Sequence, residues 1–139
     1  MKIVSLIFAT LFVFNLHATE RSPFTNIDFG LFMGWGDFIK VENPDYINSE
    51  KNHFLIEVNG KDYKDILKET KALYGKKYKC RLAEHFVQTM KEVGIEVGDT
   101  VDLKVYVFDG GHEVKELKAV PVTEDNLAEI QFETNFCKN

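Results

Sequence analysis

The stretch DTVDLKVYVFDGGHEVKELKAVPV, residues 99–122, decides the fold because it holds the clearest strand pattern in the chain. From Val101 to Val107 every second residue is aliphatic, and the residues between them are Asp, Lys and Tyr. Such alternation predicts a strand with one buried face. The Asp-Gly-Gly-His sequence at 109–112 is typical of a tight turn between two strands. The stretch therefore predicts an antiparallel hairpin.

The returning half of this hairpin is less regular. Val114 is out of phase with Leu117 and Ala119, which predicts a β-bulge. Pro121 has no N–H for a ladder hydrogen bond, so it indicates an edge strand or the end of a strand.

Two further segments show the two-residue period of strands. HFLIEV, 53–58, predicts a strand with Phe54, Ile56 and Val58 directed inward. Residues 129–136 alternate as well, which predicts a last strand. Its apolar face would consist of Ile130, Phe132, Thr134 and Phe136.

Between these strands lie two segments with helical periodicity. Residues 61–74 place their apolar side chains in one stripe, and Gly75 is a plausible C-terminal stop. Residues 79–93 form the clearest helix, with apolar positions covering about 140° of arc and Gly94 at the end. The short link at 75–78 predicts that the two helices form a hairpin.

Together with an aromatic strand over 29–38, the predicted order is β-β-α-α-β-β-β. The fold class is then α+β: an antiparallel sheet of about five strands, covered on one face by the helical hairpin. An OB-like small barrel is the alternative, because the sequence GIEVGDTV, 94–101, enters its strand as segments of many small barrels do.

The N-terminus predicts export. Lys2 precedes the apolar run 3–16, and Ala18 offers a small residue for cleavage. This is the pattern of a secretory signal peptide, and the run is short for a bilayer-spanning helix. We therefore expect residues 1–18 to be a signal peptide and 19–139 to form a single periplasmic or extracellular domain, without a membrane anchor after cleavage.

The cysteines agree with that compartment. Only Cys80 and Cys137 are present, and in an exported chain the expected state is one disulfide. Closing so long a loop contributes about 4 kcal/mol in the chain-entropy model. Because Cys80 opens the second helix and Cys137 follows the predicted last strand, the bond would join the helical layer to the sheet.

The stretch FGLFMGWGDF, 29–38, raises the question of function. In a core strand its large side chains would pack beneath the helices. In a contact surface the glycines would allow a ligand or partner to approach, with Phe32, Trp35 and Phe38 as binding residues. A third interpretation is an edge strand that accepts a strand from a partner.

Charge narrows the class of partner. The formal net charge is −5 and becomes −6 once Lys2 is removed. Such a domain gains little from polyphosphate, so we expect no nucleic-acid or anionic-membrane partner. An acidic exterior suits a basic protein partner, and the acidic loop 42–50, with Asp45 and Glu50, could form the rim of its site. The spacing in that loop does not match a calcium-binding motif.

No catalytic motif or cofactor fingerprint appears, so we expect no cofactor and no resident metal. A hydrolase built from carboxylates and His112 is one remaining hypothesis. A small-ligand carrier is another, with a pocket between helices and sheet lined by Phe54, Phe86, Met90 and Phe132. The leading hypothesis is a small exported, non-catalytic binding protein of the inhibitor, immunity or adaptor kind. The sequence does not indicate an oligomeric state.

Overall fold

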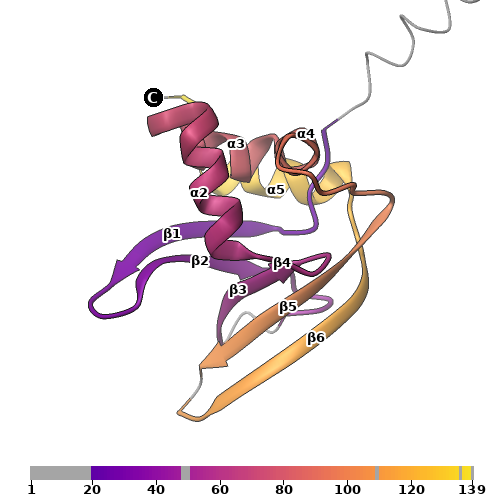
Figure 1. Cartoon of the computed structure of the whole chain (residues 1–139). Coiled ribbons are helices and arrows are strands. Elements are labelled where there is room, and N and C mark those ends of the chain that lie inside the picture. Colours follow the sequence, from indigo (N-terminus) through magenta and orange to yellow (C-terminus); the bar gives the residue numbers. More distant parts are fainter. Residues whose placement is uncertain (1–19, 48–50, 109, 135, 139) are drawn as a thin grey trace, which may run out of the picture.

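The computed structural model describes residues 20–47, 51–108, 110–134 and 136–138. The predicted signal peptide, 1–18, lies outside this range. The chain folds as an antiparallel sheet with its helices gathered on one side, which confirms the α+β class (Figure 1). The elements in chain order are β1 (Asn26–Phe32), β2 (Gly36–Glu42), β3 (Asn52–Val58), β4 (Lys61–Asp62), α2 (Tyr63–Tyr74), the 3₁₀ turn η1 (Gly75–Lys77), α3 (Tyr78–Glu84), α4 (Phe86–Glu92), β5 (Thr100–Phe108), β6 (His112–Pro121) and α5 (Glu124–Glu133).

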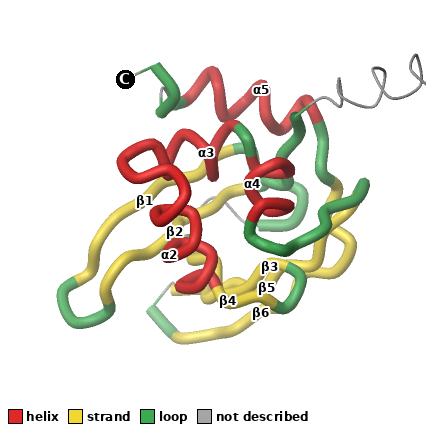
Figure 2. The backbone as a smooth tube through the Cα atoms, turned by 45° about the horizontal axis from the view of Figure 1, so that its top comes forward, coloured by secondary structure: helices red, strands yellow, loops and turns green. Residues whose placement is uncertain are grey.

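The sheet is open. Its strands lie in the order β1-β2-β3-β5-β6, and the short β4 pairs with β3. Within the described part of the chain, β1 and β6 are therefore opposite edges, and the OB-like barrel is not formed. Figure 2 shows the helices stacked over one side of this sheet. Among the described residues, no helix is long and apolar enough to cross a membrane.

The hairpin at 99–122 forms as predicted. Val101 and Val107 are buried, and the residues between them alternate between buried and open positions. The predicted bulge is present, because the pairing register shifts between Val101 and Leu103. There the Asp102 carboxylate accepts a hydrogen bond from the N–H of Ala119 at 2.9 Å, holding Ala119 at a φ of 53°. A side chain thus satisfies a backbone donor that the bulge leaves without a strand partner.

Strand β3 also forms as predicted, but the predicted inward set is confirmed only at Val58 and is wrong at Phe54 and Ile56. His53, Leu55 and Val58 are the buried residues, whereas Phe54 lies on the opposite face. A register shift between Leu55 and Glu57 explains the odd spacing of the buried positions. The bulge reverses the alternation within one short strand, which a simple two-residue count cannot detect.

Helix α2 matches the prediction, with the Asp62 side chain capping its start. The predicted second helix, by contrast, is broken at His85, whose φ of −129° and ψ of 45° are not helical. The break leaves α3 and α4 as two short helices. Thr89 lies one turn further on, and its hydroxyl donates to the carbonyl of Arg81 at 3.0 Å. The same carbonyl also accepts the N–H of His85 at 3.1 Å, so the bond from Thr89 is a second one and ties α4 to the end of α3.

The predicted strand at 129–136 is wrong, because residues 129–133 belong to α5. Thr123 caps the helix by accepting a hydrogen bond from the N–H of Asn126 at 3.1 Å. Leu127 and Ile130, three positions apart, form the buried side, whereas Phe132 is 84% exposed. The alternating apolar residues are therefore not on one face.

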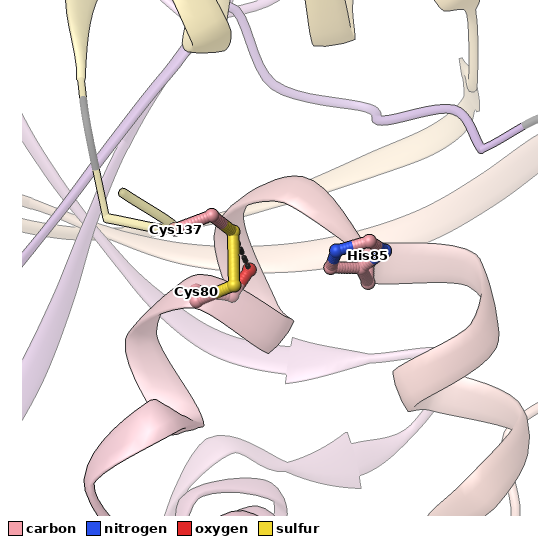
Figure 3. Close-up of side chains that lie close together, drawn as sticks. All are labelled: Cys80, His85 and Cys137. Carbon is pink, nitrogen blue, oxygen red and sulfur yellow. Dashed lines mark hydrogen bonds between the residues drawn. A yellow bond between two sulfur atoms is a disulfide. The ribbon is translucent and has the colours of Figure 1, made fainter. Parts of the chain in front are cut away.

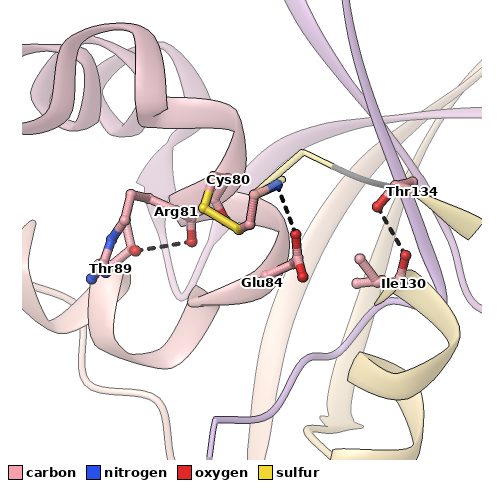
Figure 4. Close-up of a disulfide and its surroundings, with 7 residues drawn as sticks. Cys80, Arg81, Glu84, Thr89, Ile130 and Thr134 are labelled. Carbon is pink, nitrogen blue, oxygen red and sulfur yellow. Dashed lines mark hydrogen bonds between the residues drawn. A yellow bond between two sulfur atoms is a disulfide. The ribbon is translucent and has the colours of Figure 1, made fainter. Parts of the chain in front are cut away.

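The disulfide between Cys80 and Cys137 is present, with the two Cα atoms 4.6 Å apart (Figure 3). It joins α3 to the segment that follows α5, so it links two parts of the helical layer and not helix to sheet as predicted. The Glu84 carboxylate accepts a hydrogen bond from the N–H of Cys137 at 3.0 Å, and Thr134 closes α5 by donating to the carbonyl of Ile130 (Figure 4). The C-terminal segment is thus held at several points.

One hydrophobic core lies between the sheet and the helices. Phe86 and Met90 from α4 occupy its centre, at 2% and 0% exposure. The edge strand β6 leaves part of the same sheet face uncovered. There Glu113 and Lys115 stand opposite Val107 and Val105 and are exposed. Charged residues at such positions are a common feature of open sheet edges.

Candidate functional site

The stretch 29–38 is not one strand but the turn of a hairpin. Gly34 and Gly36 adopt φ values of 88° and 83°, a region that side-chain-bearing residues rarely occupy. The N–H of Trp35 donates to the carbonyl of Phe32 at 3.1 Å and closes the turn. This turn places Met33 and Trp35 in solvent, 98% and 64% exposed. The core-strand interpretation is therefore wrong for the central part of the stretch.

Next to the turn, glycine allows an aromatic ring to lie across β1. Gly30 pairs with Phe38 on β2, and a Cβ atom at position 30 would stand only 2.3 Å from Cζ of Phe38. Because Gly30 has no side chain, the Phe38 ring can fold over it. The ring then stacks against Phe32, with centroids 4.6 Å apart. This glycine therefore shapes the aromatic surface.

The rings continue across the helix-free face of the sheet. Phe54 on β3 packs edge-on against Phe32 and Phe38, at centroid distances of 5.6 and 5.3 Å. Trp35 reaches Tyr106 on β5 at 5.8 Å. Four strands, β1, β2, β3 and β5, together with the turn thus contribute to one aromatic surface. It contains a groove of about 420 Å³, which we call the aromatic groove, lined by Phe32, Met33, Trp35, Asn52, Phe54, Tyr106, Phe108 and His112.

Polar groups stand at one end of this groove. The Tyr106 hydroxyl is hydrogen-bonded to Nδ1 of His112, whose ring lies 5.6 Å from that of Phe108. Asn52 faces Phe108 across the β3–β5 pair. A mostly apolar concave surface with a few polar groups is typical of ligand and peptide sites.

The other end of the same sheet face is charged, and its charges neutralise one another. Nζ of Lys104 lies 2.7 Å from the Glu57 carboxylate and 3.9 Å from that of Glu116. The Glu57 carboxylate raises the pKa of Lys104, so this amine stays protonated. Lys118 pairs with Asp102 at 3.8 Å. At the aromatic end, by contrast, Phe32, Trp35 and Phe108 keep much of their apolar surface in solvent.

The predicted site residues separate into two groups. Phe32, Trp35 and Phe38 come together, with the first two lining the aromatic groove and Phe38 packed beside them. Asp45 is exposed in a different loop and does not line the groove. Glu50 lies outside the described residues. The proposed acidic rim is therefore not assembled at the groove by the residues that the structure describes.

Sequence reasoning missed the groove residues of the other strands. Tyr106 and Phe108 occupy the solvent-facing phase of the alternating strand, where polar residues are expected. Two aromatic residues on that phase were the signal that could have identified them. Phe54 was missed because the bulge in β3 reverses its direction.

The structure also assembles a cysteine–histidine cluster that no sequence spacing indicates. One possible ligand atom from each of Cys80, His85 and Cys137 lies within 4.8 Å of the others (Figure 3). In this state both sulfur atoms are held in the disulfide and are not thiolate ligands. The break between α3 and α4 brings His85 to this position. The cluster is therefore structural in the oxidised protein.

A second polar cluster lies on the helical layer. The Arg81 guanidinium stacks on the Tyr74 ring at 4.4 Å and pairs with Glu92 at 3.0 Å. The Tyr74 hydroxyl donates to the Glu92 carboxylate, which lowers the pKa of Glu92 and raises that of Tyr74. Both pKa values thus move further from neutral pH, whereas general acid–base catalysis requires a pKa near the working pH.

The hypotheses of a carrier and a hydrolase find little geometric support. Phe86 and Met90 belong to the packed core, Phe54 faces away from it, and Phe132 is exposed on α5, so these four residues do not line one pocket. Within the described residues, the hydrogen bond of His112 is to Tyr106 and not to a carboxylate. Asp109 lies outside the described residues.

No family model, curated protein or solved structure matches this chain. The assignment of function therefore rests on the aromatic groove itself.

Proposed function

We propose that the chain is a small exported, non-catalytic binding protein that holds an apolar segment of a partner protein in the aromatic groove. The observation that carries this proposal is the uncovered row of aromatic side chains on the helix-free face of the sheet. Phe32 and Phe108 are each 46% exposed, and Trp35 is 64% exposed. Contiguous exposed apolar surface on a small protein commonly marks an interaction site.

The composition of the groove favours a protein segment. Trp and Tyr are the residues that most often dominate the binding energy of protein interfaces, and here Trp35 and Tyr106 stand in contact. The hydroxyl of Tyr106, the imidazole of His112 and the amide of Asn52 offer hydrogen-bonding groups beside the apolar surface. A segment with one or two large apolar side chains next to backbone polar groups would match this arrangement.

Export is part of the proposal. A signal-peptide pattern precedes the domain in the sequence, and the disulfide between Cys80 and Cys137 fits an oxidising compartment. The class remains that of an inhibitor, immunity or adaptor protein.

A peptide selection tests the proposal without knowledge of the natural partner. The protein would be immobilised and used to select from a random peptide library, and the affinity of enriched peptides would be measured by calorimetry. We expect peptides rich in aromatic or large aliphatic residues, and we expect Phe108→Ser to weaken their binding at least about tenfold, the range of a hot-spot residue.

Phe132→Ser is the matched control, because Phe132 is more exposed than Phe108 but lies on α5, outside the groove. It should leave the affinity unchanged. If selected peptides bind the Phe108→Ser and Phe132→Ser proteins equally well, the groove is not the site.

A further inference from the structure

The turn between β1 and β2 exposes apolar side chains that are not all part of the aromatic groove. We call residues 31–35 the hairpin tip. Leu31 is 72% exposed, Met33 98% and Trp35 64%. Leu31 does not line the aromatic groove, and Met33 is almost entirely in solvent. In Figure 1 this end of the β1–β2 hairpin extends away from the helices. The hairpin tip is therefore a protruding apolar element and not only a wall of the groove.

Lysines on α2 stand beside this tip. Lys64, Lys68 and Lys71 follow one another at intervals of four and three residues, which places them on one side of the helix. Together with Trp35 and Asp37 they line a second hollow of about 440 Å³ between the hairpin and α2. Trp35 thus borders both the aromatic groove and this lysine-lined hollow.

The local charge near the tip is positive. Lys71 pairs with Asp37, at 2.5 Å between Nζ and the carboxylate. Lys64 and Lys68 are exposed and are in no ion pair among the described residues. Two exposed amines that form no ion pair within the described residues therefore lie next to the apolar tip.

We infer that the hairpin tip and the α2 lysines form a docking element for an anionic lipid surface. Trp and large aliphatic side chains on a protruding turn can enter the interfacial layer of a bilayer without a partner of matching shape. Lysines beside them would then contact anionic headgroups. A protein partner would need a cavity that matches this protruding tip, where Met33 is 98% exposed. A lipid surface needs no matching shape, so it is the better fit.

The negative charge of the whole domain does not exclude this contact. Charges further away than about 8 Å from the tip are largely screened at physiological ionic strength, whereas Lys64 and Lys68 would lie at the lipid surface. The expectation that no anionic membrane would bind rested on net charge alone. In the structure, the hollow beside the tip is lined by three lysines and one carboxylate, that of Asp37, so its lining carries net positive charge.

Trp35 makes the inference directly measurable, because it is the only tryptophan in the chain. The oxidised protein without its predicted signal peptide would be mixed with vesicles of phosphatidylcholine alone, or of equal amounts of phosphatidylcholine and phosphatidylglycerol. We expect a blue shift of Trp35 emission, and quenching by brominated lipid, only with the vesicles that contain phosphatidylglycerol. Added salt should weaken the binding. Absence of a shift with these vesicles would overturn the inference.

Paired charge reversals show whether the site is the one described. Lys64→Glu with Lys68→Glu should weaken vesicle binding at least about tenfold, since each lysine near an anionic surface contributes measurably. Lys76→Glu with Lys77→Glu is the control, because these exposed residues lie in η1 and give the same net charge. Equal weakening by both pairs would contradict a specific docking element.

Two single variants separate this inference from the proposed function. Leu31→Ser should reduce vesicle binding and leave peptide affinity unchanged, because Leu31 is outside the groove. Phe108→Ser should do the reverse. Thermal unfolding of each variant would show that it is folded. Retention of full vesicle binding by a folded Leu31→Ser protein would contradict insertion of the tip.

Discussion

The two faces of the sheet carry large apolar side chains but differ in what covers them. On the helix side, Ile39 and Val41 are each 1% exposed and Val105 is fully buried. On the opposite side, Phe32 and Phe108 keep nearly half of their surface in solvent. The first face therefore supplies the free energy of folding through burial. The second contributes little to folding and leaves its apolar surface available to a ligand.

The largest test of this contrast compares two phenylalanines. Phe86→Ala empties a site in the centre of the core and should lower the free energy of unfolding by about 3–5 kcal/mol. Phe108→Ala removes a ring from the open face and should change it by no more than about 0.5 kcal/mol. Urea unfolding of both variants measures the difference. Similar losses would mean that the open face is part of the folding core.

The disulfide belongs to the covered side of the molecule. Replacing Cys80 and Cys137 together by Ser should lower the free energy of unfolding by about 2–4 kcal/mol, because the unfolded chain regains the freedom of a long loop. Peptide binding to the folded fraction should be unchanged, since the bond is remote from the aromatic groove. A loss of affinity at temperatures where the variant is folded would show that the helical layer shapes the open face.

A smaller effect on stability is expected at Gly30, where the Phe38 ring lies against the backbone of β1 on the open face. Gly30→Ala places a Cβ atom where the Phe38 ring lies, so the ring must move. We expect a loss of about 1–3 kcal/mol in unfolding free energy, as for other overpacked sites. Gly98→Ala is the control, because a Cβ atom there meets nothing within 4 Å. Equal unfolding energies for the two variants would show that Phe38 can leave Gly30 at no cost.

The smallest effect on stability is expected on the helical layer, where Tyr74 is hydrogen-bonded to Glu92. The hydrogen bond from Tyr74 lowers the pKa of Glu92 below its ordinary value of 4.5. The charged form is thus favoured in the folded state, so this contribution is present above pH 4.5 and is lost as the pH falls through the lowered pKa. Glu92→Gln should therefore lose less stability than the natural protein on acidification below pH 4.5. Parallel acid dependence of both proteins would contradict this linkage.

The sequence was sufficient for the elements in which one pattern dominates. The alternation from Val101 to Val107 and the stripe of α2 each point to one structure. The segment at 129–136 has alternating apolar residues, which predict a strand. The features that identify a helix are the cap at Thr123 and the three-residue spacing of Leu127 and Ile130. A capping side chain begins a helix through one local hydrogen bond, and a residue-by-residue hydropathy count does not register it.

For the candidate site, the sequence indicated one strand of the surface and not the others. The aromatic and glycine-rich sequence around Trp35 indicates a contact surface, but its alternation predicts a strand where Gly34 and Gly36 form a turn. The residues that complete the groove come from β3, β5 and β6, and their meeting depends on strand order and on the bulge after Leu55. Neither is encoded in local periodicity.

The charged pair on the uncovered part of β6 has a consequence for how crowded solutions of this protein behave. A foreign strand that extended the sheet along this edge, as in fibril growth, would have to bring its own side chains against Glu113 and Lys115 without water. The edge thus opposes continued stacking of chains. This protection of the edge lets the molecule expose the aromatic groove to solvent without growing into fibrils through β6.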